Sequence, residues 1–249
     1  MARQKFEVTV PTEWKDITIA EFQRYLQIAK SKRKTRDDEI IALFCKVDKN
    51  LVKKLKLKDK NILVNKINSF VNSDNRTKLV KRLEFKGKKY GFIPNLSKIT
   101  TGEFVDIEQY GKEINENLHK VMSVLYREID KEVNEFYSVK PYDPDELEID
   151  KFKDLPMSTT LSAIDFFFSF RDKLIGRFKQ LFDGSDEESQ GNKTLAGKWG
   201  WYNIIFSLSN DNILNIEKVT KTEITLLLTY LSYQQDKSNI ERNNYNQHK

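Results

Sequence analysis

The chain has 249 residues and a formal net charge of +6 at pH 7, and 39% of its residues are hydrophobic. This apolar fraction is sufficient for a packed core and excludes wholesale disorder, while the scarcity of glycine and proline disfavours a turn-rich β-sandwich. The sequence has no apolar run of roughly 18 residues, the length that a membrane-spanning helix needs, and no apolar segment of the signal-peptide type near its N-terminus. We therefore expect neither a membrane segment nor a signal peptide. The single cysteine, Cys45, permits no internal disulfide, so nothing indicates secretion.

The charge is divided unevenly along the chain. Residues 1–90 contain 24 Lys and Arg against 11 Asp and Glu, whereas residues 91–249 contain 19 against 26. These two parts either attract each other or face different partners. A solvated basic surface is the simplest interpretation of the first part.

The first ninety residues predict a short strand followed by small, Lys-rich amphipathic helices. Residues 3–10 alternate between polar and apolar side chains, as in an edge strand, and Pro11 ends the alternation. A basic loop covers residues 30–36. Helices are predicted over residues 18–30, from Asp37 onward, over residues 50–55 and over residues 61–71.

The same helix-start signal, apolar–Thr–x–x–Glu–apolar, occurs three times. The threonine is expected to accept a hydrogen bond from the amide three residues later, and the glutamate to reach back to the amide of the threonine. The flanking apolar residues close over this first turn. The three pairs are Thr18 with Glu21, Thr100 with Glu103, and Thr220 with Glu223. Because nothing else repeats with them, independent use of one local solution is favoured over an internal duplication.

The middle of the chain predicts a β-hairpin and further helices. Residues 83–85 and 90–93 flank a turn with glycine at position 87, as a hairpin requires. Helices are predicted from Thr100 and from Asn115. The acidic segment over residues 130–154 contains two prolines and is interpreted as a connector.

The last third of the chain predicts one long helix and a C-terminal helical pair. Apolar residues recur at helical spacing over residues 158–182. An acidic loop follows, and Trp199 opens the next helix. The last helix starts at the third signal, and beyond Tyr233 nearly all residues are polar. This tail is either a solvated extension or a segment that orders on a partner.

Together these elements predict a mainly α fold, with amphipathic, bundle-like helical lobes, one small β-hairpin and an N-terminal edge strand. Four regions are expected. They are a basic helical lobe over residues 1–90, a central helical region over 91–183, an acidic flexible loop over 184–198, and a C-terminal helical pair with a polar tail over 199–249.

Residues that could carry catalysis are few. His119 falls on a predicted amphipathic helix, without a cysteine or second histidine at ligand spacing, and His248 lies in the polar tail. Gly87–Lys89 lacks the first glycine and the Ser or Thr of a phosphate-binding loop, and the acids at 143–150 lack the glycine and terminal glutamate of a calcium loop. Cys45 is interpreted as a core residue. We expect no enzyme, no cofactor and no metal site.

Nucleic-acid binding is the serious alternative for the basic lobe. Clustered Lys and Arg side chains are what phosphate neutralisation requires, although a solvated face has the same composition. Tyr90 and Phe92 could stack on bases. The candidate nucleic-acid contacts are Lys32, Arg33, Lys34, Arg36, Lys86, Lys88 and Lys89.

Aromatic residues near helix starts are candidates for an interface with a partner. Tryptophan and tyrosine are typical anchors of protein interfaces, but they are equally typical of a helix that docks on its own core. The candidate interface residues are Trp14, Trp199, Trp201 and Tyr202.

Three segments carry a resemblance: Phe92–Phe104, Asn117–Arg127 and Gly200–Tyr202. They resemble small proteins encoded among the virion genes of tailed bacteriophages of Bacteroidetes, including the crAss-like group. The resemblance covers residues 90–235 and leaves the basic lobe outside. It implies an assembly or virion component, such as an internal cargo, neck or tail-associated protein, with no catalytic residue to carry over.

We therefore expect a non-enzymatic structural protein of a phage particle, located in the virion or in the host cytoplasm during assembly. Its expected partners are other phage structural proteins and copies of itself in a symmetric assembly. Two alternatives stay open. One is a tail-assembly chaperone that is not retained in the virion, and the other is an accessory protein that contacts DNA through the basic lobe.

Overall fold

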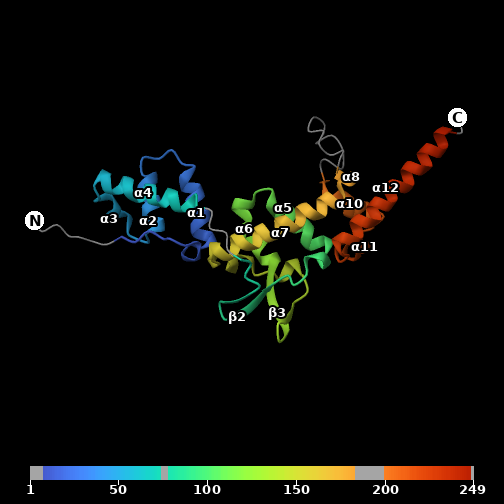
Figure 1. Cartoon of the computed structure of the whole chain (residues 1–249), viewed down its shortest axis with the longest axis horizontal. Coiled ribbons are helices and arrows are strands. Elements are labelled where there is room, and N and C mark those ends of the chain that lie inside the picture. The colour runs from blue at the N-terminus through green and yellow to red at the C-terminus, as the bar shows by residue number, and fades with distance from the viewer. Residues whose placement is uncertain (1–7, 74–77, 183–198, 248–249) are drawn as a thin grey trace, which may run out of the picture. The chain divides into compact units, whose positions relative to one another are not determined.

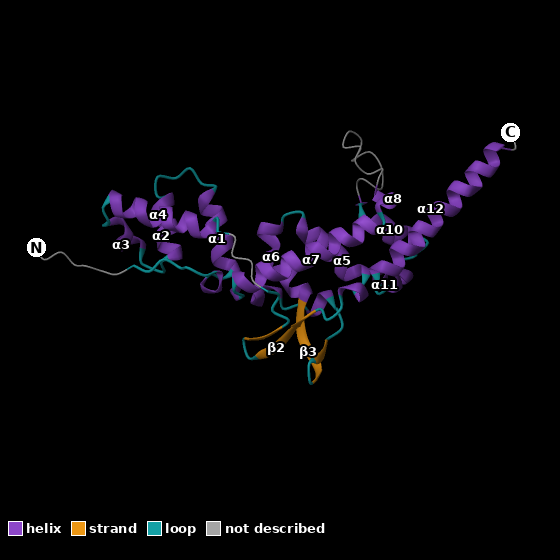
Figure 2. Ribbon diagram, viewed as in Figure 1, coloured by secondary structure: helices purple, strands orange, loops and turns teal. Residues whose placement is uncertain are grey.

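The computed structural model describes residues 8–73, 78–182 and 199–247 (Figure 1). Helices make up most of these residues, and four strands form one small antiparallel sheet (Figure 2). The predicted mainly α fold class is thus confirmed, as is the hairpin. Of the expected N-terminal edge strand, residues 3–7 lie outside the described residues, and residues 8–10 are in no strand.

The chain folds into two compact units, each made of three separate chain segments. Unit 1 comprises Met1–Phe92, Glu113–Glu128 and Asp143–Ile164. Unit 2 comprises Ile93–Lys112, Ile129–Tyr142 and Asp165–Lys249. The units therefore differ from the consecutive regions that composition suggested, because contacts between distant segments define them. The acidic loop expected over residues 184–198 lies outside the described residues.

Unit 1 begins with four helices around an aromatic core. The helices are α1 (Ile19–Ala29), α2 (Arg36–Phe44), α3 (Lys49–Lys53) and α4 (Leu57–Val71). Their number and order agree with the sequence prediction. Trp14 packs on Phe22 and Phe70 at ring-centroid distances of 5.6 and 4.6 Å, and Phe44 packs on Phe70 at 6.3 Å. Aromatic pairs at such distances add to the free energy gained by burial of the rings.

The predicted hairpin pairs with a second hairpin that the sequence did not indicate. The strands are β1 (Arg82–Phe85), β2 (Lys88–Phe92), β3 (Tyr126–Val133) and β4 (Phe136–Val139), in that spatial order. In unit 1, Tyr90 of β2 pairs with Glu128 of β3. In unit 2, Val133 pairs with Phe136 across a turn in which Asn134 has a φ of 55°. The interpretation of residues 130–154 as a connector was wrong over β3 and β4, because turn residues at 134 and 135 allow this acidic segment to fold back on itself.

Unit 1 is completed by α6 (Ile114–Leu125), the 3₁₀ helices η3 (Pro144–Glu146) and η4 (Ile149–Asp154), and the start of α7 (Met157–Arg177). Both α6 and η4 pack on α1 and on each other. The capping box predicted at Thr18 is present, with Glu21 at its N3 position. Thr18 also forms an antiparallel β-bridge with Pro156, which joins the start of α1 to the start of α7.

Unit 2 contains the rest of α7 together with α5, α8, α10, α11 and α12. Their bounds are α5 (Thr101–Gly111), α8 (Lys179–Phe182), α10 (Trp201–Leu208), α11 (Ile213–Thr220) and α12 (Ile224–Gln247). Phe104 of α5 is fully buried and lies 6.1 Å from Phe167 of α7 and 5.5 Å from Trp201 of α10. Arg171 binds Glu108 through two guanidinium nitrogens, which ties α7 to α5.

Two of the three predicted helix starts are correct. Thr100, like Thr18, forms a complete capping box. The prediction at Thr220 was wrong, because Thr220 is the last residue of α11, and its hydroxyl donates to the carbonyl of Glu217 at 3.1 Å. The last helix, α12, begins at Ile224, and the preceding helix α11 is capped by Asn212, which accepts from the amide of Leu214 at 3.0 Å. The expected C-terminal helical pair is therefore a set of three helices.

Candidate functional site

Helix α12 has two apolar faces. Its inner face carries Ile224, Leu227 and Leu228, all of which are buried. Its outer face carries large apolar side chains that are largely exposed. These are Leu226 (61% exposed), Tyr230 (48%), Tyr233 (61%) and Ile240 (60%). A surface helix of a monomeric protein normally has one apolar stripe, which faces the core. The second apolar stripe, on the outer face of α12, is therefore the strongest candidate for a contact surface.

The outer residues follow the spacing of a coiled-coil seam. Leu226, Tyr230 and Tyr233 are separated by four and three residues, and Ile240 follows after seven more. Lys237 and Asn244 occupy the two remaining seam positions in this stretch. A single polar residue at such a position selects register and partner number in coiled coils. We call the six positions 226, 230, 233, 237, 240 and 244 the α12 seam.

The C-terminal half of α12 extends past α8, α10 and α11 (Figure 1). The inner face is joined to α8 at Gln235, whose side-chain amide donates to the carbonyl of Gln180 at 3.2 Å. From residue 236 to residue 246 every side chain of the helix is exposed. The tail that the sequence presented as a solvated or partner-ordered extension is therefore helical, and its seam continues beyond the part that packs on unit 2.

The four predicted interface aromatics separate into core and surface residues. Trp14 is buried in unit 1, so its position does not support the interface role expected for it. Trp201 packs on Phe104 and Phe182 inside unit 2. Trp199 and Tyr202 are exposed, and both lie against Phe206, at ring-centroid distances of 6.1 and 6.2 Å.

The basic residues between α1 and α2 are exposed. Lys32, Arg33 and Lys34 point to solvent, and Arg36 forms an ion pair of 3.1 Å with the adjacent Asp37. The other acids in the first turn of α2 bind cations from later helices. Lys60 lies 2.6 Å from Asp38, and Lys49 lies 2.6 Å from Glu39. The Lys49 ammonium lowers the pKa of Glu39.

The basic residues of the β1–β2 hairpin face carboxylates instead. Lys86 binds Asp154, and Lys88 lies 3.2 Å from Glu128 and 3.5 Å from Glu148. The hydrogen bond to Glu128 raises the pKa of Lys88. Lys89 is exposed in the same strand. The structure therefore separates the predicted nucleic-acid contacts into a loop at residues 32–36 and a hairpin whose charges are partly compensated.

The base-stacking role expected for Tyr90 and Phe92 is contradicted by their burial. Both side chains are buried, and Tyr90 donates a hydrogen bond of 3.1 Å to Glu148. Burial raises the pKa of Tyr90 to about 12. These rings belong to the core of unit 1, where Tyr90 packs on Phe152 at 5.4 Å.

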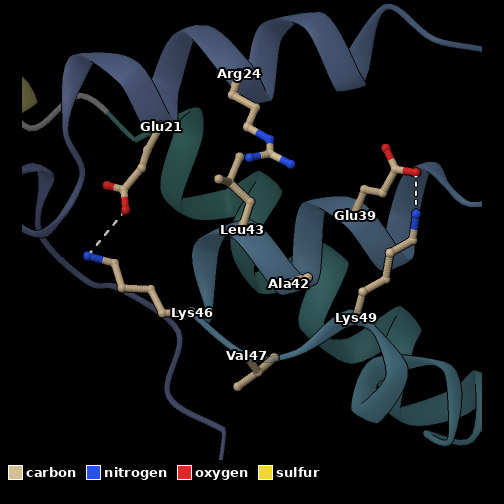
Figure 3. A pocket seen from close by; sticks show the side chains of 8 residues that line it. All are labelled: Glu21, Arg24, Glu39, Ala42, Leu43, Lys46, Val47 and Lys49. Atoms are coloured by element: carbon tan, nitrogen blue, oxygen red, sulfur yellow. Dashed lines mark hydrogen bonds and ion pairs between the residues drawn. The ribbon is translucent and has the colours of Figure 1, made fainter. Parts of the chain in front are cut away.

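One shallow pocket of about 520 Å³ lies between α1 and α2 (Figure 3). Two ion pairs border it: Glu21 with Lys46 at 3.4 Å, and Glu39 with Lys49 at 2.6 Å. Arg24 projects from α1 toward Leu43 between them (Figure 3). Both carboxylates that line the pocket therefore bind ammonium groups.

A few other titratable groups are partly or fully buried. His119 is buried, and its Nδ1 lies 3.4 Å from the side-chain Nε2 of Gln23. Burial lowers the pKa of His119. Cys45 is half-buried, and desolvation raises its pKa to about 11. Sequence reasoning missed one pair in unit 2, in which Tyr142 donates to Asp106 and burial raises the pKa of both groups. Within the residues that the structure describes, no three His, Cys, Asp or Glu side chains form a group that could hold a metal ion.

No protein-family model matches the chain, and neither a curated protein nor a solved structure shows significant similarity to it. In the described part of the chain, no helix combines the length and the apolar character needed to cross a membrane.

Proposed function

We propose that this protein is a non-enzymatic structural component of a tailed bacteriophage particle, and that it assembles with copies of itself through the α12 seam. The second apolar face of α12 is the observation that carries the proposal. The resemblance of residues 90–235 to virion proteins supplies the phage context, and α12 begins within that stretch.

The seam supports assembly because its apolar side chains remain in water when the chain is alone. Full burial of a Leu or Ile side chain is worth about 1.5–3 kcal/mol relative to exposure. Tyr230 and Tyr233 add ring area and keep their hydroxyl groups accessible at the rim of a contact, which is the usual role of tyrosine in interfaces. Burial of the seam against another chain is therefore favoured over its exposure to water, because the seam includes Leu226, Tyr230, Tyr233 and Ile240.

A second copy of the same helix is the partner that the spacing favours. Residues at intervals of four and three follow one continuous line on a helix, so two such helices bury each other when they supercoil. An isologous pair of this kind is the commonest symmetric contact between identical chains. Lys237 and Asn244 in the seam limit its strength and select its register.

The assembly can be tested on the purified chain by sedimentation equilibrium. The variant Tyr230→Ser/Tyr233→Ser/Ile240→Ser should shift the mass toward the monomer. A matched variant on exposed, off-seam positions of α12, Asn239→Ser/Asn243→Ser/Gln246→Ser, should leave the mass unchanged. A wild-type chain that stays monomeric at 100 μM, with α12 still helical by circular dichroism, would contradict assembly through the seam.

The place of the protein in the particle needs a separate measurement. Quantitative mass spectrometry of purified virions should find the chain at a defined copy number. A chain that is abundant during assembly and missing from the virions would favour the alternative role of an assembly chaperone.

A further inference from the structure

We propose that the helices α1–α4 of unit 1 bind the phosphate backbone of duplex DNA, through a basic surface formed by the α1–α2 loop and the lysines of α3 and α4. We call this the α1–α4 basic surface. It consists of Lys30, Lys32, Arg33, Lys34, Lys53, Lys54, Lys56 and Lys58. The inference does not depend on self-assembly through α12.

The charge balance of this region is the first argument. Residues 13–73 contain 15 Lys and Arg but only eight Asp and Glu. Five of the eight carboxylates are already bound in ion pairs within the region, and Asp48 accepts from the amide of Asn50 as the cap of α3. All eight cations of the α1–α4 basic surface lack an ion pair within the described residues. The described acids of the region therefore form no ion pair with these cations, although the charge of Arg33 helps to lower the pKa of Glu39 at longer range.

The fold gathers these cations at one end of α2. The α1–α2 loop enters α2 directly at Arg36. The ion pair between Lys49 and Glu39 fixes the start of α3 to the first turn of α2. The ion pair between Lys60 and Asp38 fixes the first turns of α4 to the same place. The α1–α2 loop and the starts of α3 and α4 are thus held at the same end of α2. The two carboxylates that hold α3 and α4 there, Glu39 and Asp38, are each neutralised by their own ion pair.

The side chains of the region favour a duplex backbone over bases. Lysine binds phosphate as a point charge and carries no base-specific geometry. Between residues 8 and 73, the exposed large hydrophobic side chains are Leu51, Leu57 and Ile62, and none of them is aromatic. Single-strand binding normally relies on exposed aromatic rings for stacking, so this surface suits a double strand better.

The same side chains argue against a membrane surface. An interfacial helix needs one apolar face that enters the lipid. Leu57 and Ile62 are five positions apart on α4, which places them about 140° apart around the helix axis. They therefore do not form a common face.

The test is a fluorescence anisotropy titration of the full chain with a labelled 30-base-pair duplex between 50 and 200 mM salt. The logarithm of the affinity should fall linearly with the logarithm of the salt concentration, by about 0.9 for each phosphate contact. The variant Lys32→Gln/Arg33→Gln/Lys34→Gln should weaken binding at least about tenfold and reduce the salt slope by about three contacts. Lys54→Gln/Lys56→Gln/Lys58→Gln should act in the same way.

The hairpin provides a control with the same change of charge. Lys86→Gln/Lys88→Gln/Lys89→Gln removes three positive charges, two of which already face carboxylates, and should change the affinity less than about threefold. An equal loss in this control would assign binding to net charge and overturn the α1–α4 basic surface. No binding of the wild type at 50 mM salt would overturn the proposal outright. Tighter binding to the single strand, or to vesicles containing phosphatidylserine, would overturn the assignment to duplex DNA.

Discussion

Thr100 and Glu223 face each other in an antiparallel β-bridge, although the sequence places them in two separate predicted helix starts. The amide of Thr101 donates to the carbonyl of Thr222 at 2.8 Å, and the amide of Ile224 donates to the carbonyl of Ile99 at 3.0 Å. The start of α12 is thereby joined to the start of α5. The outer seam of α12 thus lies on a helix whose start is joined to the start of α5 by two backbone hydrogen bonds, one of which is donated by Ile224, the first residue of α12.

Unit 1 contains the same junction between its own helices. The amide of Ile19 donates to the carbonyl of Leu155, and the amide of Met157 donates to the carbonyl of Ile17, at 3.0 and 2.8 Å. In each of the four segments that form these two junctions, a tight turn precedes the bridging residue. The turns run from Trp14 to Ile17, Leu96 to Ile99, Phe152 to Leu155 and Val219 to Thr222. The recurring feature is a pattern of backbone hydrogen bonds, so it is not visible as a repeated motif in the amino-acid sequence.

The first prediction concerns the capping residue of the unit 2 junction. Thr100→Ala should lower the free energy of unfolding by about 1 kcal/mol, because the hydroxyl that accepts from the amide of Glu103 is lost. Thr220→Ala should cost less than about 0.5 kcal/mol, because Thr220 ends a helix and its hydroxyl only donates to a backbone carbonyl. Urea unfolding followed by circular dichroism measures both changes. Equal losses would mean that the third helix-start signal contributes to stability despite its position.

Local signals in the sequence were sufficient for most helices. The capping boxes at Thr18 and Thr100 were predictable because all their atoms lie within four residues. The pairing of β3 with β2 was not predictable from local patterns, because it joins residues that are 38 apart at Tyr90 and Glu128. Pairing of this kind depends on the whole fold, and no local preference encodes it.

The candidate surfaces were predictable only in part. The basic loop at residues 32–36 was evident from composition, whereas the neutralisation of Lys86 and Lys88 depends on acids that are at least 40 residues away. The α12 seam was missed because the segment after Tyr233 is almost wholly polar. Its spacing, from Leu226 through Tyr233 to Ile240, was nevertheless present in the sequence and could have indicated a second face.

The second prediction concerns the reactivity of the single cysteine. Burial raises the pKa of the Cys45 thiol to about 11, and only the thiolate reacts with disulfide reagents. At pH 8 the native chain should react with Ellman's reagent about a hundredfold more slowly than the chain unfolded in urea. Because the sequence has only one cysteine, Cys45→Ser should abolish the signal. A native rate close to the unfolded rate would show that the thiol is accessible and reactive.

The third prediction separates a tryptophan of the core from one at the surface. Trp14 is only 6% exposed and contacts two phenylalanine rings, so Trp14→Ala should leave a cavity and cost about 3–5 kcal/mol of stability. Trp199 is 44% exposed, so Trp199→Ala should cost less than about 1 kcal/mol. Urea unfolding of the two variants, followed by circular dichroism, tests this difference. If Trp199→Ala also lowered the mass in sedimentation equilibrium while its unfolding curve stayed unchanged, the aromatic surface at Trp199 and Tyr202 would be a contact between chains in addition to the α12 seam. A large loss of stability in Trp199→Ala would instead place its indole in the core of unit 2.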